Sequence, residues 1–131
     1  MLIIVRGLPG SGKSTYVRNN FPGIFHIEND MFHIHEGKYC YDKSKQWNAV
    51  AWCFNTVKIA LKHGMDVVVS NTFTKKDFIQ GYVNLCEETK TPYKVIRMEN
   101  RFGNIHNVPE EVYVNMEKGF EDWEGEEIIK N

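Results

Sequence analysis

Short apolar segments alternate with amphipathic stretches along the whole chain. The short segments are rich in β-branched residues, which is typical of buried strands, whereas the longer stretches carry apolar residues at spacings of three and four, which is typical of helices. The predicted strands are residues 2–5, 23–28, 65–71 and 93–98, and the predicted helices begin near residues 13, 44, 75 and 110. This alternation predicts one three-layer α/β domain with a parallel sheet of four strands.

Residue types mark several boundaries of these elements. Gly64 is a natural end for the second helix, and Thr74 with Asp77 forms a capping pattern that predicts a third helix from Lys75. Residues 36–42 are turn-rich and aromatic, which favours a loop or a short hairpin over the ligand edge of the sheet. The second helix is expected to bury one face, made of Trp47, Val50, Ala51, Phe54, Val57 and Leu61.

Composition narrows the class of protein. With 131 residues the chain has room for one core, and no apolar run approaches the ~20 residues of a membrane helix. The first apolar run meets Arg6 and Gly7 almost at once, so a signal peptide is not expected. The three cysteines are odd in number and lack metal-binding spacing, which predicts free thiols and a cytoplasmic protein; they are Cys40, Cys53 and Cys86.

Charge is distributed unevenly behind a formal net value of −1. Residues 110–131 hold two Lys/Arg against eight Asp/Glu, so the preceding part of the chain is net positive. A positive body suits phosphate-bearing ligands, although the chain has no dense basic run of the kind that grips long nucleic acids. We expect the acidic end to be a solvated helix end or a frayed tail.

The strongest chemical signal is the stretch Gly7-Leu8-Pro9-Gly10-Ser11-Gly12-Lys13-Ser14, which fits the phosphate-binding pattern G-x-x-x-x-G-K-[ST]. It lies between a predicted strand and a predicted helix, which is the context that this loop requires. The alternative is a glycine-rich turn that binds nothing. The complete pattern and its flanks favour a nucleoside triphosphate as ligand.

Each residue type in this loop has a chemical reason. The three glycines can take positive φ and let the backbone curl without a Cβ in the way, so that backbone N–H groups point inward and form an anion-binding nest. Lys13 would reach the β- and γ-phosphates of the nucleotide, and the Ser14 hydroxyl would join the Mg²⁺ shell. The candidate nucleotide-binding residues are Gly7, Gly10, Ser11, Gly12, Lys13, Ser14 and Thr15.

Polar residues also follow the second and third predicted strands. In open α/β sheets the carboxyl ends of the strands carry the ligands, so Asp30, Asn71 and Thr72 are expected at the same edge as the loop. Asp30 could serve as a helix N-cap, as a functional carboxylate, or as both.

Taken together, the motifs resemble the small P-loop kinases grouped with phage-type 5′-polynucleotide kinase and the ATP-binding proteins related to them. The resemblance covers residues 1–121 and leaves residues 122–131 as an acidic C-terminal tail. The matching segments are Gly7–Thr15, Asp30-x-Phe32, Gly37-Lys38-Tyr39 with Tyr41-Asp42, Ala51-Trp52-Cys53, Asn71–Thr74 and Asn104-Ile105-His106-Asn107-Val108-Pro109.

The resemblance implies a P-loop NTPase fold with strand order 2-3-1-4 and an ATP- and Mg²⁺-dependent kinase. It implies that Asp30 accepts the proton of the attacking hydroxyl, with Asn71 and Thr72 on the substrate side. It also implies a lid arginine; we favour Arg101 over Arg97, because Arg97 lies within a strand pattern. The acceptor would be a nucleic-acid 5′-end, a nucleoside or a small metabolite.

The chain departs from these relatives in three ways. Ser70 stands where relatives usually have an aspartate, Val50 stands where they often have a histidine, and the segment before residue 104 is short for a lid helix. These departures leave a second hypothesis, an ATP-binding module or switch without transferase activity. A motor ATPase is disfavoured, because no acidic residue follows the central strand to position water or metal.

Overall fold

A five-stranded parallel sheet forms the centre of the computed structural model, which describes residues 1–100 and 108–130. The strand order is β2-β5-β1-β6-β7. The bounds are β1 (Leu2–Gly7), β2 (Phe25–Ile27), β5 (Val67–Asn71), β6 (Tyr93–Met98) and β7 (Glu127–Ile129). The α/β class and the order predicted for the first four strands are confirmed, whereas the predicted number of strands is one too few.

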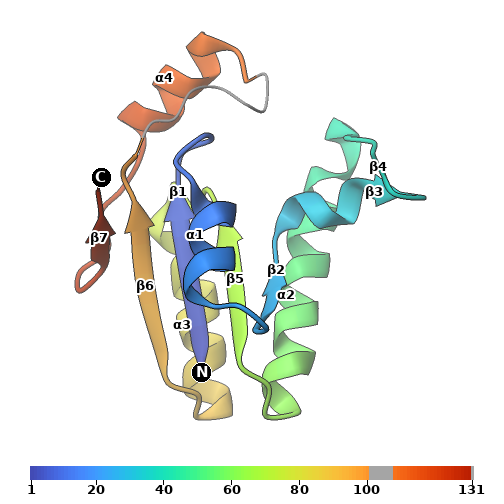
Figure 1. Ribbon diagram of the computed structural model, residues 1–131, viewed down its shortest axis with the longest axis vertical. Coiled ribbons are helices and arrows are strands. Elements are labelled where there is room, and N and C mark those ends of the chain that lie inside the picture. Colours follow the sequence, from blue (N-terminus) through green and yellow to red (C-terminus); the bar gives the residue numbers. More distant parts are fainter. Residues whose placement is uncertain (101–107, 131) are drawn as a thin grey trace.

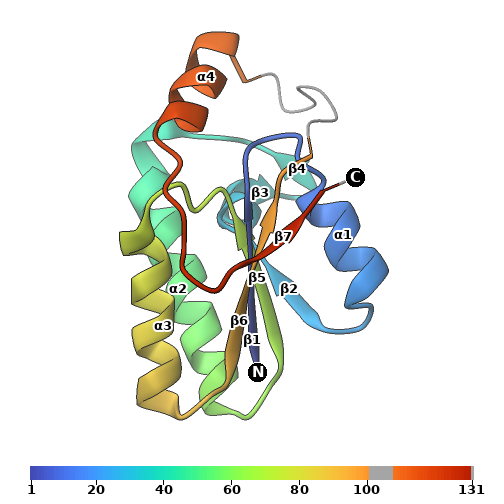
Figure 2. The same ribbon diagram turned by 90° about the vertical axis from the view of Figure 1, so that its left-hand side faces the viewer.

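Helices cover both faces of this sheet (Figure 2). On one side lie α2 (Gln46–Lys62) and α3 (Lys76–Thr89), and on the other lies α1 (Lys13–Asn20). Alternation along β1 explains the two cores, because Leu2 and Ile4 pack with α2 and α3 while Ile3 and Val5 pack with α1. The fourth helix, α4 (Glu110–Lys118), lies at the end of the sheet where the strand carboxyl ends lie (Figure 1).

The buried face of α2 differs from the expected one. Its fully buried residues are Ala49, Cys53, Val57, Ala60 and Leu61. Trp47, expected to be inward, is 69% exposed in the first turn and stacks on Phe78 of α3 with ring centroids 6.4 Å apart. Apolar residues of α2 lie at spacings of three and four on more than one side of the helix. The spacing alone therefore does not determine which side is buried, and contact with the sheet and α3 decides it.

The start of α3 also differs from its predicted cap. The helix begins at Lys76, one residue late, and the part of the chain described here provides no cap from Thr74. The backbone N–H of Lys76 instead donates to Glu121 Oε1 at 2.9 Å. The orphan N–H of the first turn is therefore satisfied by a residue that only folding brings near.

Between β2 and α2 the chain forms short elements at the ligand edge of the sheet. A 3₁₀ helix, η1 (Asn29–His33), is followed by the antiparallel hairpin β3 (Ile34–His35) and β4 (Lys38–Tyr39), and then by a second 3₁₀ turn, η2 (Lys43–Lys45). Figure 1 shows the hairpin projecting at the same end of the molecule as the loop after β1. The predicted short hairpin is thus confirmed.

The acidic end was expected to be a solvated helix end or a frayed tail, and this is wrong for residues 127–129. They form β7, which pairs in parallel with β6 and places Ile128 opposite Arg97 and Ile129 opposite Met98. Three residues carry too little alternation to identify a strand among acidic neighbours. The sheet therefore extends past the predicted domain boundary at residue 121.

The described residues contain no helix long and apolar enough to cross a membrane. The three cysteines are free thiols, as predicted: Cys40 is exposed, while Cys53 and Cys86 are buried.

Candidate functional site

The loop between β1 and α1 has the backbone shape of a phosphate cradle. Gly10 and Gly12 have φ values of 77° and 87°, as predicted. Gly7 does not have positive φ, and there the other reason expected for a glycine, the absence of a Cβ, applies. A Cβ at Gly7 would lie 2.5 Å from Ser11 Oγ and 3.0 Å from the Met98 carbonyl oxygen, so close approach is what requires glycine there.

Lys13 folds over this loop from the first turn of α1. Its amino group donates to the carbonyl oxygens of Gly7 at 2.9 Å and Leu8 at 3.0 Å. Burial lowers the pKa of Lys13 to about 8, although the negative charges of Glu28 and Asp30 act in the opposite direction. The ammonium therefore lies at the loop, as expected for a residue that binds phosphate.

Ser11 provides an independent test of whether the loop fits a phosphate group. Its side chain is buried, and its hydroxyl has no hydrogen-bond partner within residues 1–100 and 108–130. A buried unsatisfied hydroxyl costs about 1–3 kcal/mol. A phosphate oxygen in the loop would accept this proton, so the orphan hydroxyl, the left-handed glycines and Lys13 fit the same ligand.

A hydrogen-bonded carboxylate lies beside the loop, at the end of β2. Glu28 Oε2 accepts from Ser70 Oγ at 2.7 Å and from Ser14 Oγ at a longer 3.4 Å. His26 Nε2 lies 2.6 Å from Ser70 Oγ. Because Ser70 gives its single proton to Glu28, Nε2 of His26 must be the donor in that contact. Two side chains, His26 of β2 and Ser70 of β5, thus orient one carboxylate toward Ser14.

Opposing effects set the ionisation of Glu28. Burial raises its pKa, but hydrogen bonds from His26 and Ser70 and the charges of His26 and Lys13 outweigh this, so the pKa lies below its usual range. Glu28 is therefore an anion at neutral pH.

Asp30 lies two residues further on, in the first turn of η1, and its side chain is exposed. The N-cap position of η1 is Glu28, and Asp30 makes no side-chain cap bond among the described residues, so the N-cap interpretation is wrong. Tyr39 OH donates to Asp30 Oδ1 at 3.5 Å. The charge of Asp30 also acts on Lys13. Asp30 is thus an accessible carboxylate beside the loop, and its role as a base stays a prediction.

Asn71 and Thr72, at the end of β5, form hydrogen bonds with the segments on either side of them in the sheet. Asn71 Oδ1 accepts from the backbone N–H of Asn29 at 2.7 Å, which fixes the start of η1. The Thr72 carbonyl accepts from the Gly7 N–H at 3.3 Å, which joins β5 to the loop. Both residues lie at the predicted edge, and their predicted contact with substrate stays a prediction. Thr15, in α1, is exposed.

Aromatic side chains gather next to Asp30. The ring of His33 lies 4.9 Å from that of Tyr41 and 6.3 Å from that of Tyr39 between centroids, and both tyrosines are more than half exposed. A cavity of about 480 Å³ opens beside them. Its lining residues are His33, His35, Cys40, Tyr41, Asp42, Lys43 and Lys45. The hairpin and the segment that follows it, through η2, thus present aromatic and basic groups at the ligand edge.

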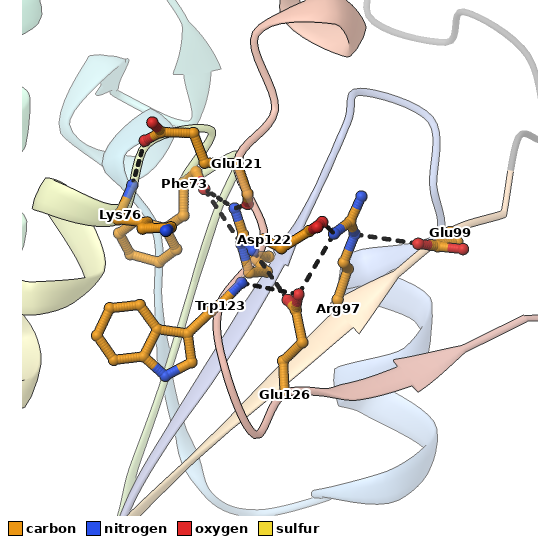
Figure 3. Close-up of polar contacts among 9 residues, drawn as sticks. Phe73, Lys76, Arg97, Glu99, Glu121, Asp122, Trp123 and Glu126 are labelled. Carbon is orange, nitrogen blue, oxygen red and sulfur yellow. Dashed lines mark hydrogen bonds and ion pairs between the residues drawn. The ribbon is translucent and has the colours of Figure 1, made fainter.

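Of the two candidate lid arginines, the structure describes Arg97 alone. Arg101 lies outside the described residues. The Arg97 guanidinium pairs with Asp122 and with Glu126 Oε2, at 3.3 Å, through Nη1 and with Glu99 through Nε at 3.1 Å (Figure 3). Arg97 therefore holds the C-terminal segment against the end of β6 through these ion pairs.

Glu28 was not among the site residues predicted from the sequence. Period-two alternation places His26 and Glu28 on the same face of β2, and that pattern was a usable signal. The contact with Ser70 depends on the pairing of β2 with β5, which the predicted strand order contained, and on the residue-by-residue register of that pairing, which was not predicted.

Comparison with known proteins places this geometry in a family. A family described as an AAA domain matches residues 2–121. An uncharacterized protein of Pasteurella multocida is 29% identical over 131 residues, covering 88% of this chain and 73% of that protein. A putative bifunctional polynucleotide phosphatase/kinase of Acanthamoeba polyphaga mimivirus is 33% identical over 87 residues, covering 66% of this chain and 18% of that protein.

Solved structures agree on the fold. Kti12 of Chaetomium thermophilum, solved in complex with ADP-AlF3, has a TM-score of 0.70 at 15% identity, covering 98% of this chain and 88% of that one. A gluconokinase of Sinorhizobium meliloti has a TM-score of 0.61 at 21% identity, covering 97% and 80%. Because the family match covers residues 2–121, most of the chain, the protein belongs to the family described as an AAA domain.

Proposed function

We propose that this protein transfers the γ-phosphoryl group of ATP to a hydroxyl group, with a nucleic-acid 5′-end or a nucleoside as acceptor. The observation that carries the proposal is the placement of Asp30. It is an exposed carboxylate at the edge of the sheet that holds the loop, and its charge acts on Lys13. A base beside a phosphate-binding lysine is what hydroxyl phosphorylation requires.

Each residue has a separate task in this reaction. The loop N–H groups and Lys13 bind the phosphates, and Asp30 accepts the proton as the acceptor oxygen forms its bond to the γ-phosphorus and ADP leaves. The Ser14 hydroxyl beside the Glu28 carboxylate fits Mg²⁺, a cation that prefers oxygen ligands. When bound, Mg²⁺ neutralises charge on the β- and γ-phosphates.

The aromatic hairpin supports a base-bearing acceptor. Tyr39 and Tyr41 are exposed rings 6.4 Å apart, next to Asp30, and Lys43 and Lys45 line the adjoining cavity. Bases stack on such rings, each contributing about 1–3 kcal/mol, while lysines contact the phosphates between them. The similarity to a polynucleotide phosphatase/kinase supports the same class of acceptor.

A transfer assay with γ-labelled ATP tests this proposal. The acceptors are a 5′-hydroxyl oligonucleotide, free nucleosides and sugars including gluconate. We expect label on the oligonucleotide or a nucleoside. Label on a sugar alone would show that the acceptor class is wrong, and bound ATP without transfer to any acceptor would favour the non-transferring module.

The variant Tyr41→Ala examines the acceptor side of the site. We expect KM for the oligonucleotide to rise about tenfold or more, because a base loses its stacking partner, while KM for ATP holds. The control is Trp47→Ala, which removes an exposed ring that stacks on Phe78. Equal effects from both variants would argue against a stacking role for the hairpin.

A further inference from the structure

The Mg²⁺ site implied by the loop lacks one of its usual components. P-loop NTPases hold Mg²⁺ with the loop Ser/Thr and with an acidic residue from a neighbouring strand. Here the loop supplies Ser14, but β5, which lies beside β1, ends in Ser70 and Asn71. A hydroxyl and an amide carry no charge, so a carboxylate for this site has to come from another element.

Glu28 is positioned to be that carboxylate. It follows directly on β2, the neighbour of β5, and its Oε2 contacts both the Ser70 hydroxyl at 2.7 Å and the Ser14 hydroxyl at 3.4 Å. The serine on β5 thus binds the carboxylate that its own strand does not supply. By accepting the Ser14 proton, Glu28 leaves the lone pairs of Ser14 Oγ available to a cation.

The surrounding side chains hold Glu28 in this position. Ser70 is buried, and His26 approaches Ser70 Oγ at 2.6 Å and Glu28 Oε2 at 3.4 Å. A carboxylate fixed by several donors loses little rotamer freedom when a ligand arrives, which suits a residue that orients a metal ligand.

We infer that Glu28 is the positioning carboxylate of the Mg²⁺ site for bound ATP, acting through Ser14 in place of an acidic residue on β5. The inference rests on the proposed ATP binding and assigns to Glu28 a role separate from that of Asp30. Glu28 supports metal-dependent nucleotide binding, whereas Asp30 accepts the proton of the acceptor.

The test measures ATP affinity by calorimetry, once with excess Mg²⁺ and once in EDTA, for the wild type, Glu28→Gln, Asp30→Asn and Glu36→Gln. The last variant neutralises an exposed glutamate of the hairpin turn. We expect the Mg²⁺-dependent gain in affinity to fall ~10–100-fold in Glu28→Gln, as is usual when a carboxylate behind a metal ligand is removed. Asp30→Asn and Glu36→Gln should keep this gain. Mn²⁺ binding to the ADP complex, followed by electron paramagnetic resonance, should weaken in Glu28→Gln alone.

Each outcome separates the inference from the proposed function. A wild type that binds no ATP in either condition contradicts ATP binding itself. A wild-type Mg²⁺-dependent gain retained in Glu28→Gln, or lost in Asp30→Asn instead, overturns the assignment to Glu28. If Glu28→Gln does not fold by circular dichroism, Glu28→Asp keeps the charge and draws the carboxylate back from Ser14. A reduced gain then supports the inference, and an unchanged one overturns it.

Discussion

At the scale of single residues, the protonation state of Lys13 is expected to control how strongly the loop binds phosphate. Its pKa is lowered to about 8 by burial, so folding disfavours the charged form. Relative to an exposed lysine with a pKa near ~10.4, this costs stability at pH below 8, and the cost disappears as pH rises toward 10. The ammonium that a phosphate needs is present below pH 8 and is lost above it.

We therefore expect ATP affinity to be constant from pH 6 to 7 and to fall as pH rises through about 8, by up to ~10-fold per pH unit above the pKa. Fluorescence titration with a labelled nucleotide at each pH measures this. Lys13→Arg keeps its charge throughout, so its affinity, though weaker, should not change between pH 7 and 9. An identical decline in Lys13→Arg would assign the effect to another group.

Asp30 can be tested as a base without disturbing the fold. Because its side chain is exposed and makes no cap bond among the described residues, Asp30→Asn should leave the free energy of unfolding nearly unchanged. Loss of proton acceptance should lower kcat by ~10²–10⁴-fold, with ATP affinity maintained by the loop. Transfer assays quenched at fixed times measure kcat, and nucleotide titration measures ATP affinity. Transfer at the wild-type rate would remove Asp30 from the mechanism.

At the scale of elements, a buried arginine of β1 joins that strand to the segment that follows α4. Arg6 is fully buried; it donates to the Phe73 carbonyl at 2.7 and 3.1 Å and to the Glu121 carbonyl at 2.6 Å, and it pairs with Glu126 at 2.8 Å. Phe73 has a φ of 44°, which is strained for a residue with a large side chain. Arg6 thus stabilises both the turn after β5 and the segment between α4 and β7.

We expect Arg6→Met to lower the free energy of unfolding by about 3–5 kcal/mol, because it removes the 2.8 Å ion pair of the buried Glu126 carboxylate and leaves that charge with the longer contact to Arg97 at 3.3 Å. The double variant Arg6→Met/Glu126→Gln should recover part of this loss, since a buried carboxylate that has lost its shorter ion pair is made neutral. Urea denaturation measures both. Arg18→Met, which removes an exposed arginine bonded to Thr15, is the control and should cost little. A double variant no more stable than the single one would argue against a charge effect.

At the scale of the whole molecule, the C-terminal residues complete the sheet. Glu121 caps α3, Glu126 pairs with Arg6, and β7 covers the outer edge of β6. A chain ending at residue 121 would lose the last two contacts and expose a strand edge that pairs readily with other chains. Residues 122–131 are therefore expected to be needed for folding.

Comparison of residues 1–121 with the full chain tests the predicted domain boundary. We expect the shorter chain to unfold at lower urea concentration by at least the effect of Arg6→Met, and to associate on storage. Size-exclusion chromatography with urea denaturation measures both. A shorter chain that is monomeric and as stable as the full one would restore the boundary at residue 121.

The sequence by itself determined the order of the first four strands through the family resemblance, and the nucleotide loop through residue chemistry. Apolar runs and the pattern from Gly7 to Ser14 are local, so they can be recognised before folding. The exposed carboxylate after β2 and the aromatic hairpin were visible for the same reason.

Only the tertiary structure decided what depends on contacts between distant residues. The Glu28 carboxylate meets the Ser14 hydroxyl through a side-chain contact, α3 takes its cap from Glu121, and Arg6 finds Glu126 because the chain returns past β6 to form β7. The rotation of α2 was likewise set by packing, which left Trp47 outside and Cys53 inside. Such pairings are separated by up to 120 residues, and a local pattern carries no record of them because the free energy that selects them comes from the assembled sheet.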